Sequence, residues 1–389
     1  MLENNNIICF GTADWDNPYR TNQHNIMERL ASKNRILFIE SLGLRQPAAQ
    51  KKDITRILKR LKKGLGGVRK PAENIFVFSP LVLPFHRFKS VRALNNTILK
   101  NKLRSIIKKY GFNDSLIWTY VPAVADTIGA LESRMVIYHC VDELSANPLI
   151  PDILRKIEED FIRDNADLVF VTSKSLYDSK SGFSNAVHYL PNVADFKHFN
   201  KAISGSGRVP QDIKDIKRPV AGFIGAVSEY KLDIELIKHV AEKMTDVSFV
   251  FIGPSGEGEK AVDPNNVIDM ENVHFLGPKP FEKLPDYLRE FNICLLPNRI
   301  NEYTRNMFPL KFFEYLSAGK PVISTDLPAL REFSNYYYTA SGGDDFIDKI
   351  KKALDEDNRE KINSRIDLAS RYTWEKRVEE MSEIIRNAR

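Results

Sequence analysis

The sequence predicts an α/β protein made of two doubly wound, Rossmann-like domains with parallel sheets. Short apolar strands alternate with amphipathic helices along most of the chain, which is the pattern of such sheets. A polar stretch with Gly and Pro separates two such series, and 389 residues suit two domains. We expect a first domain over residues 1–200, a linker over 201–218, a second domain over 219–371 and a final helix over 372–389.

The chain opens with a strand, a loop and a helix that predict the first binding surface. Ile7 to Thr12 forms the strand, 13–21 the loop, and Asn22 is the expected cap of a helix that ends near Lys33. Ligands of doubly wound sheets lie beyond the carboxyl ends of the strands. The loop side chains expected to face this cleft are Trp15, Asp16 and Arg20. The alternative is a solvated loop with one packed tryptophan.

A later strand, Arg134 to Cys140, ends in a second polar group. A histidine and an acid at the carboxyl end of a strand are well placed for proton transfer. We therefore regard His139 and Asp142 as candidate catalytic residues. The alternatives are a half-buried, hydrogen-bonded His139 and an Asp142 that caps a helix.

Positive charge is concentrated in one part of the first domain. Between Arg45 and Lys109 we count 18 Lys or Arg against two acids. The segment Lys51 to Lys70 is predicted to form a basic amphipathic helix followed by a Gly-rich loop, and such a helix suits an anionic membrane surface. The residues expected to face the membrane are Lys59, Arg60, Lys62 and Lys63. Nucleic acid is a rival partner, although no nucleic-acid motif is present, and a solvated basic face is the third interpretation.

Cysteine usage and apolar runs predict the compartment. The three cysteines, Cys9, Cys140 and Cys294, lie in apolar runs without paired spacing, which indicates reduced core residues and no metal site. No apolar run approaches the ~20 residues that span a bilayer, and no signal peptide is recognisable. We expect a cytoplasmic protein that can attach to the inner face of the membrane.

The most informative stretch of the second domain is Leu296 to Thr325. It predicts a strand end, a polar loop over 298–306, a helix that starts at Pro309, and a further strand. The free N–H groups of such a helix would favour an anion such as a diphosphate, and Lys311 adds positive charge. The carboxylate of Glu314 could accept hydrogen bonds from a ribose diol. The alternative is an ordinary βαβ unit with a surface Lys and Glu.

The first strand of the second domain, Pro219 to Val227, carries Gly225 near its end. Glycine at this place lets a ligand approach the backbone closely. Lys231 follows in the next loop, and the family resemblance described below implies that it contacts a phosphate. The alternative is a surface lysine.

Together these motifs resemble the donor-binding signature of GT-B glycosyltransferases, especially the retaining enzymes of family 4. The family pattern is an acid, seven residues, a second acid, and then small-x-Gly-x-Pro-Val. Glu314 falls on the second acid, whereas Asn306 falls on the first. Gly225 and Lys231 fit the family's spacing of glycine and lysine, but Ala226 stands where the family has arginine.

The resemblance implies that a sugar moves from a nucleoside-diphosphate sugar to a saccharide or lipid-linked acceptor during synthesis of a bacterial surface polysaccharide. It implies two facing domains with the active site in the cleft, an acceptor loop after the first strand, and a last helix that braces the first domain. It also aligns Asp142 with the acid of the family's His-Asp pair. Because no DxD pair stands in a donor context, we expect no metal and no cofactor. Catalysis would then depend on positioning and on charge, with Lys231 and Lys311 beside the leaving diphosphate.

Three other interpretations stay open. Asn306 and Ala226 are compatible with an inactive scaffold of this fold, and the fold also hosts non-hydrolysing nucleotide-sugar epimerases. A dinucleotide-dependent oxidoreductase is disfavoured, because no strand is followed by G-x-G-x-x-G. Turnover of the donor separates an enzyme from a scaffold, and an acceptor requirement separates a transferase from an epimerase.

Overall fold

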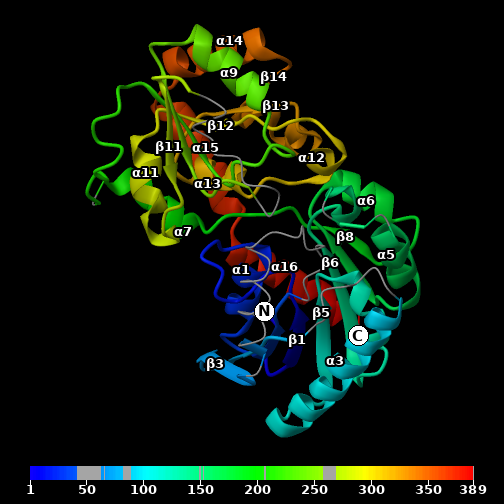
Figure 1. Cartoon of the computed structure of the whole chain (residues 1–389). Coiled ribbons are helices and arrows are strands. Elements are labelled where there is room, and N and C mark those ends of the chain that lie inside the picture. The colour runs from blue at the N-terminus through cyan, green and yellow to red at the C-terminus, as the bar shows by residue number, and fades with distance from the viewer. Residues whose placement is uncertain are drawn as a thin grey trace. The chain divides into compact units, whose positions relative to one another are not determined.

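A computed structural model of the chain shows two compact units, which are treated separately below (Figure 1). Unit 1 comprises Met1–Pro191 together with Val378–Arg389, and unit 2 comprises Asn192–Arg377. The structure describes residues 1–41, 63–64, 66–81, 89–148, 150–151, 153–205, 207–256 and 269–388. Within these ranges, every helix is too short or too polar to cross a bilayer.

Unit 1 is built on an eight-stranded sheet in the order β3-β4-β2-β1-β5-β6-β7-β8. All neighbours are parallel except β3, which pairs antiparallel with β4. The strand order reverses between β1 and β5. In doubly wound sheets, ligands bind at such a reversal, beyond the carboxyl ends of the strands. The strands are β1 (Asn6–Phe10), β2 (Arg35–Ile39), β3 (Val68–Ala72), β4 (Ile75–Phe78), β5 (Ser115–Thr119), β6 (Ser133–Cys140), β7 (Leu168–Val171) and β8 (Val187–Tyr189).

Helices cover this sheet, and three of them were not predicted from the sequence, including the short helices Ala125–Ile128 and Lys174–Lys180. The third is the longest. It is α3 (Lys89–Tyr110), whose Leu99, Leu103 and Ile106 are buried in the core of unit 1. The other helices are α1 (Asn22–Leu30), α4 (Ala125–Ile128), α5 (Ile153–Asp164) and α6 (Lys174–Lys180), with 3₁₀ turns η1 (Pro122–Val124) and η2 (Leu144–Ala146).

The cap of α1 differs from the prediction by one residue. Thr21 caps the helix in a capping box with His24, and their side chains lie 2.8 Å apart. The predicted cap, Asn22, is instead buried and accepts a hydrogen bond from the hydroxyl of Tyr120. Asn22 therefore packs inside the unit, and Thr21 makes the turn into the helix.

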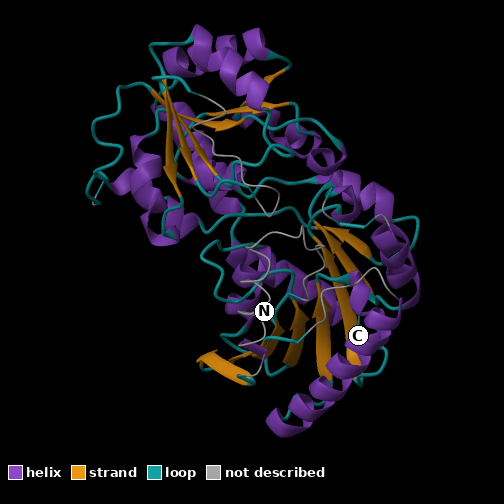
Figure 2. Cartoon of the chain, viewed as in Figure 1, coloured by secondary structure: helices purple, strands orange, loops and turns teal. Residues whose placement is uncertain are grey.

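Unit 2 contains a six-stranded, fully parallel sheet in the order β11-β10-β9-β12-β13-β14 (Figure 2). Here the strand order reverses between β9 and β12. The strands are β9 (Val220–Ile224), β10 (Ser248–Ile252), β11 (Val273–Gly277), β12 (Ile293–Leu296), β13 (Val322–Thr325) and β14 (Tyr338–Ala340). The helices are α7 (Phe196–Phe199), α8 (Lys201–Ser204), α9 (Ile234–Lys243), α11 (Leu284–Glu290), α12 (Glu302–Asn306), α13 (Lys311–Ser317), α14 (Gly343–Glu356) and α15 (Arg359–Arg371), with 3₁₀ turns η3 (Phe281–Lys283) and η4 (Pro328–Tyr336).

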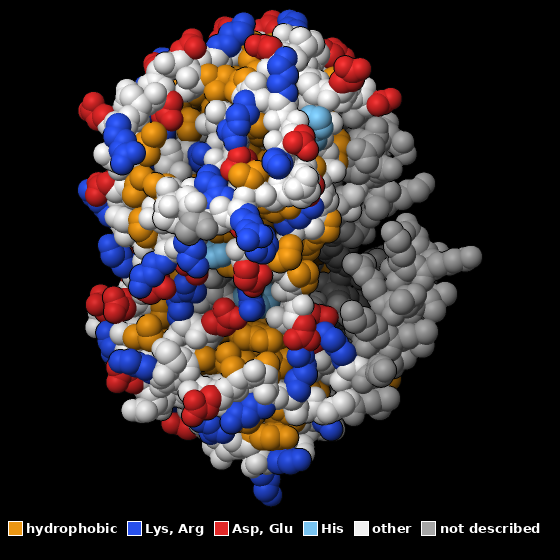
Figure 3. Space-filling model, turned by 90° about the vertical axis from the view of Figure 1, so that its left-hand side faces the viewer, with side chains coloured by type: hydrophobic (Ala, Val, Ile, Leu, Met, Phe, Trp, Pro, Cys, Tyr) orange, Lys and Arg blue, Asp and Glu red, His pale blue; other side chains and the backbone are white. Residues whose placement is uncertain are grey.

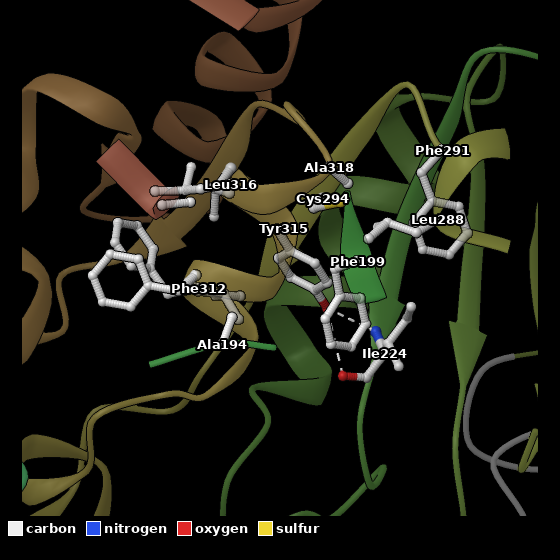
Figure 4. Close-up of a cluster of buried hydrophobic side chains, with 14 of the residues drawn as sticks. Ala194, Phe199, Ile224, Leu288, Phe291, Cys294, Phe312, Tyr315, Leu316 and Ala318 are labelled. Carbon is white, nitrogen blue, oxygen red and sulfur yellow. Dashed lines mark hydrogen bonds between the residues drawn. The ribbon is translucent and has the colours of Figure 1, made fainter. Parts of the chain in front are cut away.

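Two hydrophobic clusters fill unit 2, one on each face of its sheet. One cluster joins the strands to α9 and α14, and the other joins them to α11, α13 and α15 (Figure 4). Gly222 of β9 is needed in the second cluster, because an added Cβ would lie 2.1 Å from the ring of Phe291. These close-packed clusters hold the strands and the starts of the helices in place. The loops at the carboxyl edge of the sheet therefore extend from a rigid framework.

The last helix, α16 (Trp374–Asn387), belongs to both units. It starts after Thr373, whose hydroxyl accepts a hydrogen bond from the backbone N–H of Lys376. Its residues to Arg377 group with unit 2, and those from Val378 onward group with unit 1. The predicted boundary at residue 200 also differs from the division, which falls between Pro191 and Asn192.

The polar segment 298–306 was predicted to be a loop throughout. In the structure its second half forms α12. The side chain of Asn301 accepts a hydrogen bond from the N–H of Thr304, and the hydroxyl of Thr304 accepts one from the N–H of Asn301. This capping box forms a short helix without the apolar period that sequence analysis looks for. The Gly-rich loop predicted after the basic helix is also shorter than expected, since Val68 to Lys70 lies in β3.

Candidate functional site

The candidate site of unit 2 lies at the carboxyl ends of β9 and β12, where the strand order reverses. The loops that follow these two strands are joined by backbone hydrogen bonds. The N–H of Arg299 donates to the carbonyl of Lys231 at 2.8 Å, and the N–H of Asp233 donates to that of Pro297 at 2.9 Å. The backbone of Lys231 is therefore held in place by the loop after β12.

Gly225 lies just beyond β9, whereas the predicted strand extended to Val227, and it faces a second glycine that follows β10. Its N–H donates to the carbonyl of Ile252 at 2.8 Å. Gly253 has φ of 149°, and an added Cβ would lie 1.9 Å from the carbonyl oxygen of Gly225. Only glycine fits at residue 253, so the two loops approach more closely here than side chains would allow.

Lys231 lies against two aromatic rings. Its ammonium is 5.5 Å from the ring centre of Tyr230 and 5.1 Å from that of Tyr303, and the two rings meet edge to face. A cation over aromatic faces is held by the ring quadrupoles. Tyr303 lies in α12, and Asn306 is the last residue of that helix. The side-chain amide of Asn306 donates to the carbonyl of Glu302 at 2.8 Å. The tyrosines were not predicted, because isolated aromatics in a polar segment carry no periodic signal.

The helix predicted to start at Pro309 starts at Lys311. Pro309 precedes it in a single turn, closed by a hydrogen bond from Phe312 N–H to the Pro309 carbonyl at 3.1 Å. The ammonium of Lys311 contacts Glu314 Oε2 at 2.6 Å. Glu314 is 7% exposed, and burial raises its pKa above the ordinary value although Lys311 opposes the shift. Lys311 and Glu314 therefore form an ion pair in which the carboxylate of Glu314 is buried.

A tyrosine ties this helix to the end of β9. The hydroxyl of Tyr315 accepts a hydrogen bond from the N–H of Ile224 at 2.8 Å, and both residues are buried (Figure 4). Ile224 precedes Gly225, and Tyr315 follows Glu314. The bond therefore fixes the predicted acid relative to the predicted glycine loop. In the sequence Tyr315 looks like one more core aromatic, so its role was missed.

In unit 1 the loop after β1 is anchored by a tryptophan and a buried acid. Trp15 is 7% exposed and packs on Phe38 and His24, with ring centres 5.0 and 5.7 Å away. The backbone N–H of Trp15 donates to Glu40 Oε1 at 2.8 Å, and Glu40 is itself buried at the end of β2. Trp15 is therefore a core residue that holds the loop. Glu40 was missed, since a single acid after a strand gives no motif.

The charged residues of this loop are paired. Asp16 contacts Arg69 at 2.7 Å, and Arg20 contacts Glu28 at 2.8 Å. Lys63, which was expected to face a membrane, has its ammonium 3.2 Å from Asp14 and 3.7 Å from Glu40. Lys59, Arg60 and Lys62 lie outside the described residues.

His139 lies inside the core of unit 1. It is 1% exposed and stacks on Tyr120 with ring centres 5.0 Å apart, between the rings of Trp118 and Phe170. It is therefore more deeply buried than the half-buried histidine considered from the sequence. Asp142 lies beyond the end of β6 and is partly exposed, so of the predicted pair only the acid reaches the surface of the unit.

A buried ion network that was not predicted lies beside Asp142. Lys180 contacts Glu143 at 2.8 Å and Glu158 at 2.7 Å, and all three side chains are at most 8% exposed. The hydroxyl of Tyr138 donates to Glu158 at 2.5 Å. Burial alone would raise the pKa of Glu143, but the nearby Lys180 ammonium holds it below the ordinary value. Members of the network come from β6, α5 and α6, so no local spacing reveals it.

Solved structures define the class of fold. Three of the similar structures are sucrose-phosphate synthase from Thermosynechococcus elongatus, Anabaena HepE with UDP-glucose, and trehalose-phosphate synthase from Burkholderia xenovorans with glucose-6-phosphate. Their TM-scores are 0.70, 0.67 and 0.70, and their identities are 14%, 13% and 11%. Each match covers 98% of this chain and 98–99% of the other chain. The fold is therefore GT-B, as the sequence predicted.

Sequence comparison matches part of the chain to a known family. Residues 218–356 match the family described as glycosyl transferases group 1. TuaH of Bacillus subtilis (strain 168), provisionally named as a teichuronic acid biosynthesis glycosyltransferase, is 30% identical over 257 residues. That match covers 61% of this chain and 64% of TuaH. The similarity to the group 1 glycosyltransferases thus lies in the second unit, and the match spans less than two thirds of the length of TuaH.

Proposed function

We propose that this protein transfers a sugar from a nucleoside-diphosphate sugar to a saccharide or lipid-linked acceptor in the synthesis of a surface polysaccharide. The observation that carries the proposal is the tied pair of segments in the group 1 domain. The loop with Gly225 and Lys231 and the helix with Lys311 and Glu314 are joined through Tyr315. The name of TuaH supports the polysaccharide role.

In this proposal the residues of unit 2 hold the donor. Lys231 and Lys311 place positive charge beside the diphosphate, where negative charge grows as the sugar leaves. Glu314 accepts the ribose hydroxyls, because Lys311 contacts one of its oxygens and an ionised carboxylate has about four acceptor positions. The Asn306 segment lies next to the sugar and takes the place of an acid there. We also propose a metal-free reaction with retained anomeric configuration, which NMR of the product would test.

Asp142, Asp16 and Arg20 are the residues of unit 1 that we assign to the acceptor side. Asp142 is partly exposed at the end of β6, and Asp16 and Arg20 lie on the loop after β1. Trp15 and His139 are assigned supporting roles, because both are buried.

Binding of one nucleotide family should raise the melting temperature of the protein. A ligand that binds the folded state stabilises it by about 2.7 kcal/mol at a hundredfold excess over Kd. The measurement is a thermal-shift panel of UDP, GDP, ADP, dTDP and CMP with their sugar conjugates. HepE has been solved with UDP-glucose, so uridine conjugates come first. If none of them shifts the melting temperature, the inactive-scaffold interpretation replaces the proposal, and donor turnover without an acceptor would indicate an epimerase.

Attachment to an anionic membrane is a second part of the proposal, and α3 supports it. This helix has seven Lys or Arg and no acid, and its exposed face carries Leu94 and Ile98, which are 49% and 43% exposed. Exposed apolar side chains on a basic helix suit an anionic lipid surface. By contrast, on the face shown in Figure 3, Lys and Arg are interspersed with Asp and Glu among the described residues.

We expect the variant Leu94→Gln, Ile98→Gln, Lys102→Gln, Lys109→Gln to lose binding to phosphatidylglycerol vesicles in a co-sedimentation assay. Each basic residue near such a surface contributes about 1 kcal/mol, so two of them change binding roughly thirtyfold before the apolar loss is counted. The control is Lys351→Gln with Lys352→Gln on α14, which should sediment like the parent protein. Equal sedimentation of the two variants, or no binding of the parent, would contradict membrane attachment through α3.

A further inference from the structure

A pocket of about 940 Å³ opens at the carboxyl ends of β12, β13 and β14 in unit 2. Its walls come from the loops after these strands and from the starts of α9 and α14. None of the residues assigned to the donor lines it. It shares one wall with the donor site, however, because Asn298 and Arg299 line the pocket and also bind the carbonyl of Lys231.

The pocket is lined by three guanidinium groups from separate segments, those of Arg299, Arg305 and Arg331. Arg331 is paired with Asp326 at 2.9 and 2.5 Å. Among the described residues, Arg299 contacts no carboxylate, and it is exposed.

The two remaining acids of the wall are engaged within their own helix. Asp233 caps α9 by accepting from Leu236 N–H, and Glu235 contacts Lys238 at 3.2 Å. The acids therefore have partners of their own, and Arg299 can bind an anion without displacing an existing ion pair.

The start of α14 adds a second source of positive potential. This helix has 14 residues, and Gly342 at its N-cap offers no side chain to the first N–H groups. The acids of its first turn are bound elsewhere, since Asp344 contacts His239 and Lys243, and Asp345 accepts from Ser341 N–H at 2.8 Å.

An unpaired acceptor in the wall points to a ligand with hydroxyl groups. Asn298 is 5% exposed, and its Nδ2 donates to the carbonyl of Lys231 at 3.3 Å. Its Oδ1 is buried and has no hydrogen-bond partner among the described residues. Buried polar atoms nearly always have a partner. The apolar lining from Leu236, Ile300 and Pro328 offers contact for the carbon face of a ring.

We propose that this pocket binds a sugar that carries an anionic group, either a phosphate or a carboxylate. Arg299 and the start of α14 bind the anion, and Asn298 accepts a hydroxyl. Because Asn298 and Arg299 also hold Lys231, occupancy of the pocket changes the affinity of the donor site. Binding of the anionic sugar does not depend on the proposed function. Only the change in donor affinity rests on the proposed function.

The test is isothermal titration of the full chain with glucose 6-phosphate, glucuronate, glucose and inorganic phosphate. We expect the two anionic sugars to bind more tightly than glucose or phosphate, and their ranking shows which anion is preferred. Arg299→Gln should weaken their binding by about tenfold or more, because a charge-assisted hydrogen bond is lost. Gly342→Phe should also weaken it, because the added side chain stands at the start of α14. The φ of 169° accepts any residue, and an added Cβ has no protein atom within 4 Å. The control is Arg359→Gln, an exposed arginine of α15 outside the pocket.

Nucleotide binding, measured in the same variants, keeps the two proposals apart. If anionic sugars bind whereas no nucleotide does, the result supports the pocket proposal and contradicts the proposed function. If Arg299→Gln and Gly342→Phe bind anionic sugars like the parent protein, or if these sugars compete with the nucleotide for one site, the pocket proposal is overturned. Absence of binding by either anionic sugar, or equal binding of inorganic phosphate alone, overturns it as well.

Discussion

Lys180→Met is expected to lower the free energy of unfolding of the protein by about 3–5 kcal/mol. The substitution leaves Glu143 and Glu158 buried near each other without the ammonium that now contacts both. Removal of one partner from a buried ion network is costly, because the remaining charge stays out of water. Chemical denaturation followed by fluorescence and circular dichroism measures the change.

Two further variants separate the network from a general loss of packing. Lys156→Met removes an ammonium from a pair with Asp160 whose lysine is 70% exposed, and should cost at most about 1 kcal/mol. Glu143→Gln and Glu158→Gln, added to Lys180→Met, should recover part of the loss, since no buried charge remains. A loss below about 1 kcal/mol in Lys180→Met itself would show that the network does not stabilise unit 1.

The stability difference between the parent and Lys180→Met should also depend on pH. The folded-state pKa of Glu143 is depressed, so its contribution is present above the unfolded value of about 4.3 and is lost as pH falls through the folded pKa. The pKa of Lys180 is raised, because Glu143, Glu158 and Cys140 outweigh the effect of burial. Its contribution is present below the unfolded value of about 10.4 and is lost as pH rises beyond it. The difference should therefore be largest between about pH 5 and pH 10.

Glu314→Gln is expected to weaken nucleotide binding by about tenfold to a hundredfold. A hydrogen bond to an ionised carboxylate contributes about 1.5–3 kcal/mol, and the amide keeps the shape of the side chain but loses the charge. Isothermal titration with the nucleotide selected by the thermal-shift panel measures the affinity. Glu379→Gln, an exposed acid of α16, is the matched control and should bind like the parent protein.

A dideoxy analogue of the same nucleotide tests whether Glu314 contacts the ribose. Without the two hydroxyls, the parent protein should lose about the same affinity as the variant does, and the variant should show little further loss. Additive losses would place Glu314 outside contact with the ribose, and unchanged affinity of Glu314→Gln for the normal nucleotide would remove it from the site.

Every described strand except β3 could be predicted from the sequence, because buried parallel strands are short, continuous apolar runs. β3 is a mostly exposed edge strand, VRKPA, and carries no such run. The β9 and β12 segments, with the turn at Gly319, follow directly from such runs. α12 could not be predicted, because its capping box stabilises a helix without an apolar stripe. α3 was missed because its basic residues suggested a surface segment and concealed the buried stripe of Leu99, Leu103 and Ile106.

Residues of the candidate site could be predicted where a local spacing carries the signal. Gly225, Lys231, Lys311 and Glu314 were predicted in this way, since each lies in a recognisable strand–loop–helix unit, and their roles stay predictions. Tyr315, Glu40 and Lys180 act through partners that are far away in the chain, with separations of 91 residues for Tyr315 and 37 for Lys180. Contacts over such separations depend on the tertiary structure, and no pattern within one window reveals them.

The division of α16 between the units has a consequence for biosynthesis. Val378, Met381 and Ile385 are buried and group with unit 1, although they are translated after the whole of unit 2. While the ribosome is still making unit 2, the nascent first unit lacks these side chains and exposes the apolar surface that they will cover. We therefore expect the folding of unit 1 to be completed only after residues 378–385 have left the exit tunnel of the ribosome.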